Sequence, residues 1–413
     1  MDQLKDVALT NGMPGIRVQY ILGPIWGKTA AQLRADVALG TNPLTGAPVI
    51  QEIIDKLTKP LTAEEKRTGE VVRSRGPETF TGTADELQKM FLENRYTDFL
   101  PIILPTKEKV DEMLAATSHD PDEKLGEMSP FKPTFESWSY TVKIAAINAV
   151  MAGAKPEYFP VILAIGSTGS EAMDVSDNGF ATGAVVNGNI RDEIGMNYNY
   201  GAMGPYAHAN TTIGRAWTLL SINGGNCGKV GTTYMGTVGN PMNGLNIIIA
   251  ENEEKSPWDP LSVRIGRGEG MMTFPGAPAP KLQNFKKGEN VITLFMGWGV
   301  LSAKNWYANV WGDKMDYPQI IKDIYRTQDG TLFGTCAVLS PPIANFVKRD
   351  GYDTVEKFTE WVKEAQGDAK SDGMYIQPPG GQFTVIVTGA SNNNYFSMGG
   401  FRPGASVRID DWR

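Results

Sequence analysis

The stretch that decides the fold is CAVLSPPIANFVKRDGYDTVEKFTEWV, residues 336–362 of a chain of 413 residues. It begins with a short apolar run that is typical of a buried strand. Asp353-Thr-Val-Glu356 then resembles the capping box that opens a helix. The apolar residues that follow, Phe358, Trp361 and Val362, share one helix face. The stretch therefore predicts a strand followed by a helix.

The same alternation continues on both sides of this stretch. Strands are predicted over Val291–Phe295 and Thr384–Thr388, and a helix over Tyr317–Tyr325. Ser137–Met151 is apolar nearly all round and predicts a buried helix, and Asn210–Ile222 predicts an amphipathic one. Alternating strands and helices indicate parallel pairing in part of the sheet. We therefore predict an α/β fold with mixed, partly parallel sheet layers, flanking helices and an extended N-terminal arm.

The chain divides into three predicted regions. Residues 1–80 form the N-terminal extension, where short apolar pieces alternate with Gly and Pro and Ala47–Leu57 predicts one short helix. Such an arm wraps a neighbouring subunit or the main body, or is an ordinary irregular extension. Residues 81–285 are predicted to be a helix-rich α/β domain, and residues 286–413 a C-terminal α/β domain. Within the former, residues 166–208 are rich in Gly and Asn and predict a long functional loop.

Composition excludes several classes of protein. The chain has 39 basic and 46 acidic residues and a net charge of -7, which argues against a nucleic-acid binder with a general basic surface. With only Cys227, Cys336, His119 and His208, it lacks the ligands for a Cys-rich zinc site or a multi-His site. Any metal would be held mainly by oxygen ligands. Since we find no apolar run of ~18 residues and no signal-peptide pattern, we expect a cytoplasmic protein without a membrane partner.

The densest group of chemically active residues is Glu251-Asn252-Glu253-Glu254, directly after a short apolar strand. Ligands of open α/β sheets bind outside the carboxyl ends of strands. Adjacent carboxylates repel, so one can have a raised pKa and act as general acid or base, or the group can hold a divalent cation. We therefore predict catalysis or metal binding by Glu251, Glu253 and Glu254, and substrate binding by Asn252 and Trp258. The alternative is a solvated acidic loop in which Trp258 plugs the core.

A second candidate is the start of the helix at Asn210, Thr211 and Thr212, together with Arg215. Helix N-terminal amides and an Arg suit a carboxylate or phosphate. The alternative is an N-cap and a surface Arg paired with a Glu. His208, just before this helix, is a candidate proton shuttle or simply a hydrogen-bonding loop residue.

The remaining motifs give weaker signals. Cys227, flanked by Gly and followed by Lys229, is a candidate reactive thiol or an incidental turn residue, and Cys336 is predicted to lie in the core. Gly23–Thr29 is one residue short of a P-loop, and Arg264–Gly270 does not lie between strand and helix as a dinucleotide fingerprint requires. Thr388-Gly-Ala-Ser-Asn-Asn-Asn follows a strand and is a possible phosphate or substrate loop.

Four segments together resemble one family: Tyr96–Thr106, Ala146–Val161, Ala209–Ala216 and Ala250–Trp258. The pattern is similar to the large, poorly characterised proteins associated with UGSC-motif selenoproteins and their cysteine counterparts, and it covers roughly residues 80–390. The resemblance implies a cytoplasmic protein that works with a small thiol or selenol subunit, by analogy to component B of glycine reductase. The residues that fall on the pattern are Glu157, Asn210, Arg215, Glu251, Asn252, Glu253, Glu254 and Trp258.

The sequence also departs from the pattern of that family. Asp177–Gly183 and Ile343 stand where the pattern has histidines, and the Cys/Sec-Gly-Ser-Cys motif is absent. The resemblance therefore does not make Cys227 the redox residue of the family. It implies a divergent member, or a subunit whose thiol sits on another chain.

Three functions remain open at this level. The first is an enzyme, a lyase or oxidoreductase, that acts on a small polar or anionic molecule by carboxylate acid/base chemistry with a thiol-bearing partner. The second is a metal-dependent hydrolase or lyase complete in one chain, and the third is a non-catalytic scaffold subunit. No cofactor fingerprint is present, and a divalent metal is the one cofactor left open. The arm and the Gly-rich loops predict a homo-oligomer.

Overall fold

The computed structural model divides the chain into two compact units, which we describe separately. Unit 1 comprises Met1–Arg73 and Phe131–Ser137, and unit 2 comprises Ser74–Pro130 and Trp138–Arg413. The residues that the structure describes are 8, 13, 15–21, 23, 27–68, 73–129, 137–173, 181–204, 206–230, 233–234, 236, 239–269, 282–297, 301–305, 315–327, 335–364, 383–391, 394–399 and 401–413.

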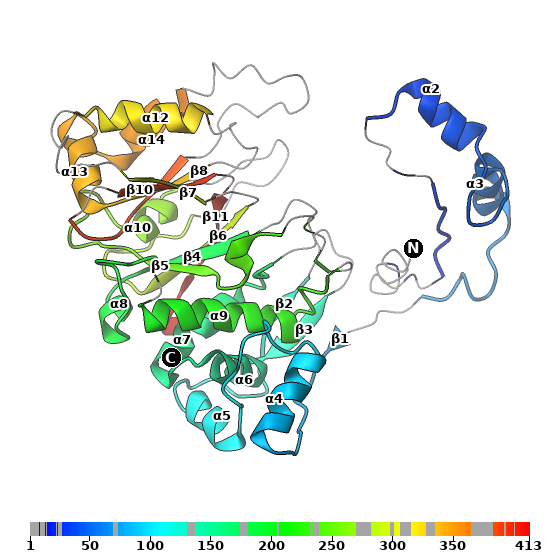
Figure 1. Cartoon of the computed structure of the whole chain (residues 1–413), viewed down its shortest axis with the longest axis horizontal. Helices are drawn as coiled ribbons and strands as arrows, with labels where there is room; N and C mark the ends of the chain where they lie inside the picture. The colour runs from blue at the N-terminus through cyan, green and yellow to red at the C-terminus, as the bar shows by residue number, and fades with distance from the viewer. Residues whose placement is uncertain are drawn as a thin grey trace. The chain divides into compact units, whose positions relative to one another are not determined.

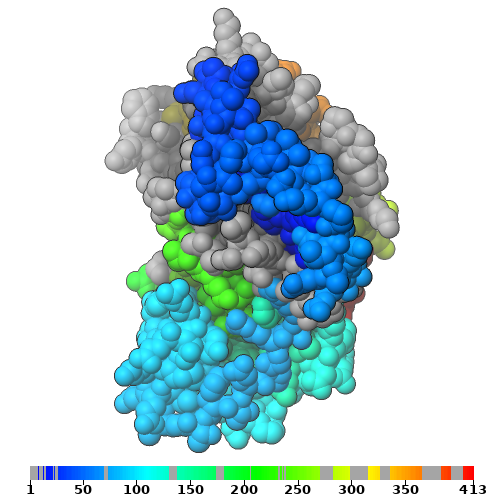
Figure 2. Space-filling view, turned by 90° about the vertical axis from the view of Figure 1, so that its right-hand side faces the viewer, coloured from blue at the N-terminus to red at the C-terminus, as the bar shows by residue number. Residues whose placement is uncertain are grey.

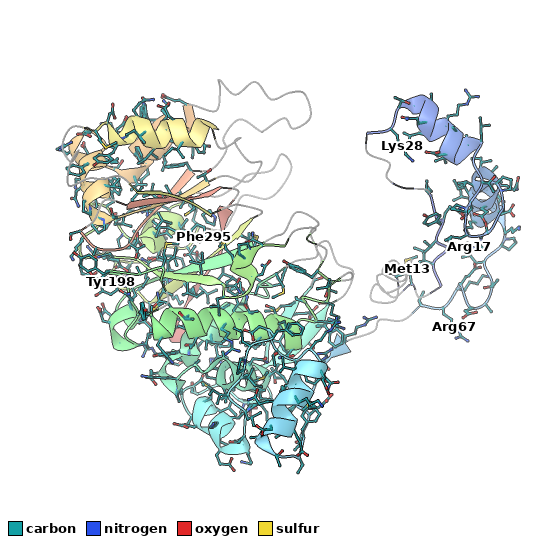
Figure 3. All side chains as sticks on the ribbon, viewed as in Figure 1. Met13, Arg17, Lys28, Arg67, Tyr198 and Phe295 are labelled. Atoms are coloured by element: carbon teal, nitrogen blue, oxygen red, sulfur yellow. The ribbon has the colours of Figure 1, made fainter. Side chains whose placement is uncertain are left out.

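Unit 1 is a small helical segment with little core. It contains α2 (Ala30–Leu33), continued by a π-helical turn (Arg34–Ala38), and α3 (Val49–Thr58), the helix predicted near this position. The Arg17 guanidinium, labelled in Figure 3, donates to three backbone carbonyls at the end of α3 and to the Glu65 carboxylate. Many large apolar side chains of this unit are exposed, among them Leu39, Leu44, Ile54, Leu57 and Leu61.

Unit 2 contains two four-stranded sheets and a short hairpin. The first sheet has the order β11-β6-β4-β5, and the second has the order β7-β10-β8-β9. The strand bounds are β4 Ala181–Asn187, β5 Ile247–Ala250, β6 Val291–Gly297, β7 Leu301–Asn305, β8 Thr335–Leu339, β9 Phe383–Val387, β10 Asn394–Gly399 and β11 Phe401–Arg408. β2 (Lys124–Met128) and β3 (Trp138–Thr141) pair antiparallel, and β1 covers Arg73–Ser74.

The two sheets repeat one pattern of pairing. β4 is parallel to β5 and antiparallel to β6, and β8 is parallel to β9 and antiparallel to β10. The outer partners are exchanged: β7, which follows β6 in the chain, pairs with β10, and β11, which follows β10, pairs with β6. The register matches as well, because Val186 pairs with Ala250 just as Leu339 pairs with Val387. Each position after β4 and β5 thus has a counterpart after β8 and β9.

The sheets pack face to face between two layers of helices (Figure 1). Side chains alternate along the strands, as the period of two requires: in β8, Cys336 and Val338 face the core between the sheets, whereas Ala337 and Leu339 join the core under the outer helices. Phe295, labelled in Figure 3, belongs to the core between the sheets. The predicted α/β fold with mixed, partly parallel sheets and flanking helices is confirmed.

Helices α6, α7 and α9 cover the first sheet. The helix bounds on this side are α4 Ala84–Glu93, α5 Lys107–Leu114, α6 Val142–Ala152, α7 Phe159–Ser167, α8 Ile190–Glu193 and α9 His208–Asn223, with 3-10 turns at Pro156–Tyr158, Pro241–Asn243 and Asp410–Trp412. α6 begins where the Thr141 side chain caps the Ile144 amide and ends at Gly153 with a left-handed φ of 80°. It is buried nearly all round, as predicted, but it begins later because its expected first turn is strand β3.

Helices α12 (Tyr317–Thr327), α13 (Pro341–Arg349) and α14 (Val355–Lys363) cover the second sheet, and α10 (Leu261–Gly266) packs into the core between the sheets. The N-cap of α14 lies one residue later than predicted: Thr354, rather than Asp353, accepts a hydrogen bond from the Lys357 amide. Within the described ranges, no helix combines the length and apolar character needed to cross a bilayer.

Two features differ from the sequence prediction. The predicted loop over residues 166–208 contains β4, a central strand of the first sheet, whose seven residues are all buried and therefore show no alternation. The predicted border between residues 285 and 286 does not separate compact units. β6 and β11 lie beyond that border, and they extend the sheet that begins with β4.

Candidate functional site

The carboxyl ends of both parallel strand pairs meet in the middle of unit 2. The backbone amide of Asn252 donates to the Val387 carbonyl at 2.7 Å, and Thr388 Oγ1 donates to the Ala250 carbonyl at 2.7 Å. We call the residues that follow β4 and β5 the first carboxyl edge, and those that follow β8 and β9 the second carboxyl edge. This junction is where ligands of α/β sheets bind.

The first carboxyl edge is filled by a buried polar network around Glu251. Its Oε2 accepts from the Asn187 side chain at 2.6 Å and from the Leu261 amide at 2.7 Å. Its Oε1 lies 3.6 Å from the guanidinium of Arg264. The carboxyl is fully buried, and this burial raises the pKa of Glu251 above its ordinary value. Glu251 thus connects β4, β5 and α10.

Arg264, which the sequence analysis did not single out as a site residue, connects the two sheets. Its guanidinium donates to the Val385 carbonyl in β9 at 2.6 Å and to Glu269 at 2.5 Å, and its Nε donates to the Asp259 carbonyl at 2.9 Å. A buried guanidinium needs such a full set of acceptors. The sequence offered no signal for this role, because the acceptors lie far apart along the chain.

Glu253 and Glu254 are held by the start of α8. Glu253 accepts from the Gly188 amide at 2.7 Å and from Asn187 at 3.0 Å. Glu254 pairs with Arg191 at 2.8 Å; partial burial opposes its charge, but the Arg191 hydrogen bond prevails and lowers the pKa of Glu254. Among the described residues, no group of three or more His, Cys, Asp or Glu side chains is placed to hold a metal ion. The carboxylates of this edge therefore have structural partners.

Asn252 and Trp258 flank the network in different ways. The Asn252 side chain donates to the Gly389 carbonyl at 2.9 Å and to the Tyr198 carbonyl at 3.2 Å, so it ties the loop before α9 to the second carboxyl edge. Trp258 stacks on Phe358 with 6.5 Å between ring centroids and belongs to the core beneath the outer helices. Trp258 thus plugs the core, and of the three glutamates before it Glu251 and Glu253 are buried whereas Glu254 is half-exposed.

The predicted anion site at the start of α9 is occupied by protein groups. Asn210 lies within α9 and is buried, and its side-chain amide donates to the Ile248 carbonyl at 3.0 Å. Arg215 binds both carboxylate oxygens of Asp98, at 2.8 and 2.9 Å, and donates to the Pro101 carbonyl. Arg215 is therefore paired, with an Asp rather than the Glu that the sequence suggested.

His208 and Cys227 contact residues outside the junction network, whereas Cys336 lies close enough to Arg264, Glu269 and Glu251 for their charges to act on its thiol. His208 is the exposed first residue of α9, and its Nδ1 lies 3.3 Å from the Tyr158 hydroxyl. Cys227 is buried, and its thiol donates to the Gly225 carbonyl at 3.6 Å. Cys336 lies in the core, as predicted, and burial raises the pKa of its thiol. Both thiols are enclosed by protein.

The second carboxyl edge is open where the first is filled. A cavity of about 330 Å³, which we call the junction pocket, lies at the ends of β8 and β9. It is lined by Asn199, Tyr200, Gly201, Ala202, Met203, Gly204, Val338, Ser340, Thr388, Gly389 and Ala390. Gly389 has a left-handed φ of 96°, which turns the chain at the pocket wall. The Tyr200 hydroxyl and Ser391 Oγ are 2.8 Å apart at this edge.

The pocket lining combines polar and apolar groups, and none of the described lining residues carries a formal charge. Its side chains offer hydroxyls from Tyr200, Ser340 and Thr388 and the amide of Asn199. α13 begins at the pocket with Pro341 and Pro342, which lack the amide hydrogens that a helix N-terminus offers to an anion. The arrangement suits a neutral molecule that exchanges hydrogen bonds with hydroxyl and amide groups.

The junction pocket matches the sequence predictions only in part. The segment that begins Thr388-Gly-Ala-Ser, a possible substrate loop by sequence, contributes Thr388, Gly389 and Ala390 to the lining. Of the predicted site residues, Asn252 contacts this edge through Gly389 and Tyr198, the residue labelled in Figure 3. The loop of residues 199–204 carried a signal only in its high Gly and Asn content.

Comparison with known proteins adds no further assignment. No protein-family model matches the chain, and no curated protein matches it.

Proposed function

We propose that the chain is the substrate-binding subunit of an enzyme, a lyase or oxidoreductase, that acts on a small polar molecule. The observation that carries the proposal is the junction pocket, a cavity of about 330 Å³ at the carboxyl ends of two parallel strands. Its volume is in the range of small-molecule sites. Its position is the one that α/β sheets use for ligands.

The lining narrows the substrate to a neutral molecule with hydroxyl or amide groups. Burying an ion without a partner is costly, and the described lining supplies none. Lys255, which is not a lining residue, donates from its Nζ to Oδ1 of the lining residue Asn199 at 3.5 Å. Of the polar and anionic substrates that the sequence allowed, the geometry favours the polar ones.

The glutamates have a positioning role in this proposal. Glu251 and Glu253 fix the first carboxyl edge through their hydrogen bonds. The Asn252 side chain between them donates to the Gly389 carbonyl, so it links this edge to the pocket wall. A thiol step would need a thiol from a second protein, since Cys227 and Cys336 are enclosed. The resemblance to the UGSC-associated proteins, which implies a small thiol partner in the cytoplasm, is consistent with this division of labour. The exposed apolar side chains of unit 1 favour the predicted homo-oligomer.

Ligand binding by the intact chain tests the proposal. Thermal-shift titrations would compare neutral alcohols and amides with carboxylates and phosphates of matched size. We expect a neutral compound to raise the melting temperature, and Thr388→Val to abolish this rise. The matched control is Thr168→Val, which also removes a threonine hydroxyl bonded to a carbonyl at 2.7 Å, in this case that of Ile165.

Two results would contradict the proposal. Stabilisation by anions alone would mean that the charge of the substrate is misassigned. A ligand-induced rise in melting temperature that persists in Thr388→Val would place the ligand elsewhere. That result would favour the non-catalytic scaffold function.

A further inference from the structure

A second cavity lies among the helices, away from the two carboxyl edges. It has a volume of about 130 Å³ and is lined by Arg75, Gly76, Pro77, Glu78, Phe80, Phe91, Tyr96, Pro105, Ile144, Ile147, Asn148, Met151 and Asn223. We call it the aromatic pocket. Its walls come from α4, α6 and the last residue of α9, which lie together in Figure 1. Figure 2 shows the surface that the α4 and α5 segments form on this side of unit 2.

Asn223, one of the lining residues, has a polar atom without a partner among the described residues. Asn223 Oδ1 is buried and accepts no hydrogen bond. The orientation of the amide is determined by its surroundings, because Nδ2 faces the Tyr96 carbonyl at 3.0 Å and Asn148 Oδ1 at 2.7 Å. Asn148 in turn donates its own Nδ2 to the Ile144 carbonyl, so its Oδ1 must accept. The oxygen of Asn223 is therefore the atom left for a donor outside this network.

The rest of the wall suits an aromatic ring. Phe80, Phe91 and Tyr96 form a triad with centroid distances of 6.0, 6.0 and 6.3 Å, and two of the three pairs meet edge to face. Such rings offer both faces and edges to a further ring. An apolar cavity of about 150 Å³ is large enough to bind benzene. The aromatic pocket has a similar size, but its lining also includes Arg75, Glu78 and Asn148 as well as Asn223 with its buried acceptor.

The pocket has a route to solvent on one side. The covering residues 76–80 form neither helix nor strand, and they are exposed. The segment is anchored at Arg75, which donates to Asn226 at 3.4 Å and lies 5.3 Å from the ring centroid of Trp138. A small molecule can therefore enter past this segment without opening the helical core.

We propose that the aromatic pocket binds a small aromatic molecule with a single O–H or N–H donor, which bonds to Asn223 Oδ1 while its ring packs on Phe80, Phe91 and Tyr96. This site is separate from the junction pocket and does not depend on the function proposed there. Phenol is the simplest probe of the class, and toluene is its match in size without the donor.

Calorimetric titration of the full chain with phenol and with toluene tests the proposal. Because phenol gives up more hydration than toluene, an apolar hole alone would favour toluene. We expect the opposite, with phenol bound at least about tenfold more tightly, since a site with a buried acceptor discriminates against ligands that lack the donor. Equal affinities, tighter toluene binding or no binding of either probe would overturn the proposal.

Two variants locate the binding. Ile147→Phe fills the cavity and keeps Asn223, and we expect it to lose both probes. Asn223→Leu removes the acceptor, and we expect it to lose the preference for phenol. The matched control is Asn345→Leu, because the Asn345 side-chain amide also donates two hydrogen bonds, in this case to the Lys255 and Pro341 carbonyls, but lies on α13. Unchanged phenol binding in Ile147→Phe would place the probe elsewhere and refute the site, whether or not Asn223→Leu folds.

Discussion

The two carboxyl edges have the same topology but opposite contents. Glu251 of the first edge and Thr388 of the second edge occupy equivalent positions, because each directly follows the last paired residue of its strand. At the first edge, Glu251 and its partners fill the space with ion pairs and hydrogen bonds. At the second edge, Thr388 and Gly389 line a cavity. One strand arrangement thus supports both a filled structural junction and an open cavity.

The difference arises from the residues that follow the strands. A glutamate has the reach to bridge β4, β5 and α10, whereas a threonine hydroxyl bonds only to the adjacent Ala250 carbonyl. A glycine next to that threonine adds no side chain. The acidic cluster is the more conspicuous pattern in the sequence, but its carboxylates are paired with Arg191, Arg264 and the Gly188 amide. The less conspicuous Thr-Gly-Ala segment leaves room for a ligand.

The largest expected effect is at the arginine that joins the sheets. Arg264→Leu leaves Glu251 and Glu269 buried without their guanidinium. We expect a loss of about 3–5 kcal/mol in the free energy of unfolding, measured by denaturant titration. The control is Arg267→Leu, which removes an exposed pair with Asp259 and should cost about 0–1 kcal/mol. Similar losses in both variants would mean that the first edge is not a buried junction.

The next effect separates a structural from a catalytic Glu251. Glu251→Gln keeps the shape but removes the charge beside Arg264, and we expect a loss of about 1–3 kcal/mol, with ligand binding in the junction pocket retained. Glu254→Gln, which changes a half-exposed neighbour, should cost less. If Glu251→Gln keeps full stability but abolishes turnover, Glu251 acts directly on the substrate and the comparison of the two edges fails.

A smaller effect is expected at the second edge. Thr388→Val removes the hydrogen bond to the Ala250 carbonyl and should destabilise the chain by about 1 kcal/mol. Ligand binding should be lost at the same time, because Thr388 lines the pocket. Paired denaturation and binding measurements check this. A destabilisation as large as that of Arg264→Leu would show that the second edge is a structural junction too.

The smallest effect lies outside both edges, at His119. Its ring stacks on Trp412, and its nitrogens lie 2.9 Å from the Asp411 carbonyl and from Glu123. The Asp411 carbonyl, followed by Glu123, raises the pKa of His119. The protonated ring therefore stabilises the folded chain. The full stabilisation is present below the unfolded pKa of about 6.5, and it is lost as the pH rises through the folded pKa of His119.

The pH dependence of unfolding checks that sign. Between about pH 6 and 8 the unmodified chain should lose a little stability that His119→Gln does not lose. The same slope in both would remove His119 as its source. A pH-dependent loss of stability larger than the loss caused by Thr388→Val would reverse the ranking of His119 and Thr388.

The sequence predicted most of the elements but only part of the site. Strands such as β6 and β9 were found because they are short apolar runs, and α6 because its residues are apolar nearly all round. β4 was missed because a central strand buried on both faces lacks alternation. The polar positions Glu251 and Asn252 were found, but their partners come from distant segments that no local pattern connects.

Sequence alone determined the class of the fold, because hydrophobic periodicity and helix caps are local properties. It also determined that the chain carries few thiols and imidazoles, which limits its own chemistry. Only the tertiary structure decided which carboxyl edge is filled and which is hollow. That outcome depends on whether folding brings Arg264 to Glu251 and brings Arg191 to Glu254, 63 residues away along the chain. Charge in a sequence indicates reactivity, but the partners brought by folding decide whether that charge remains available.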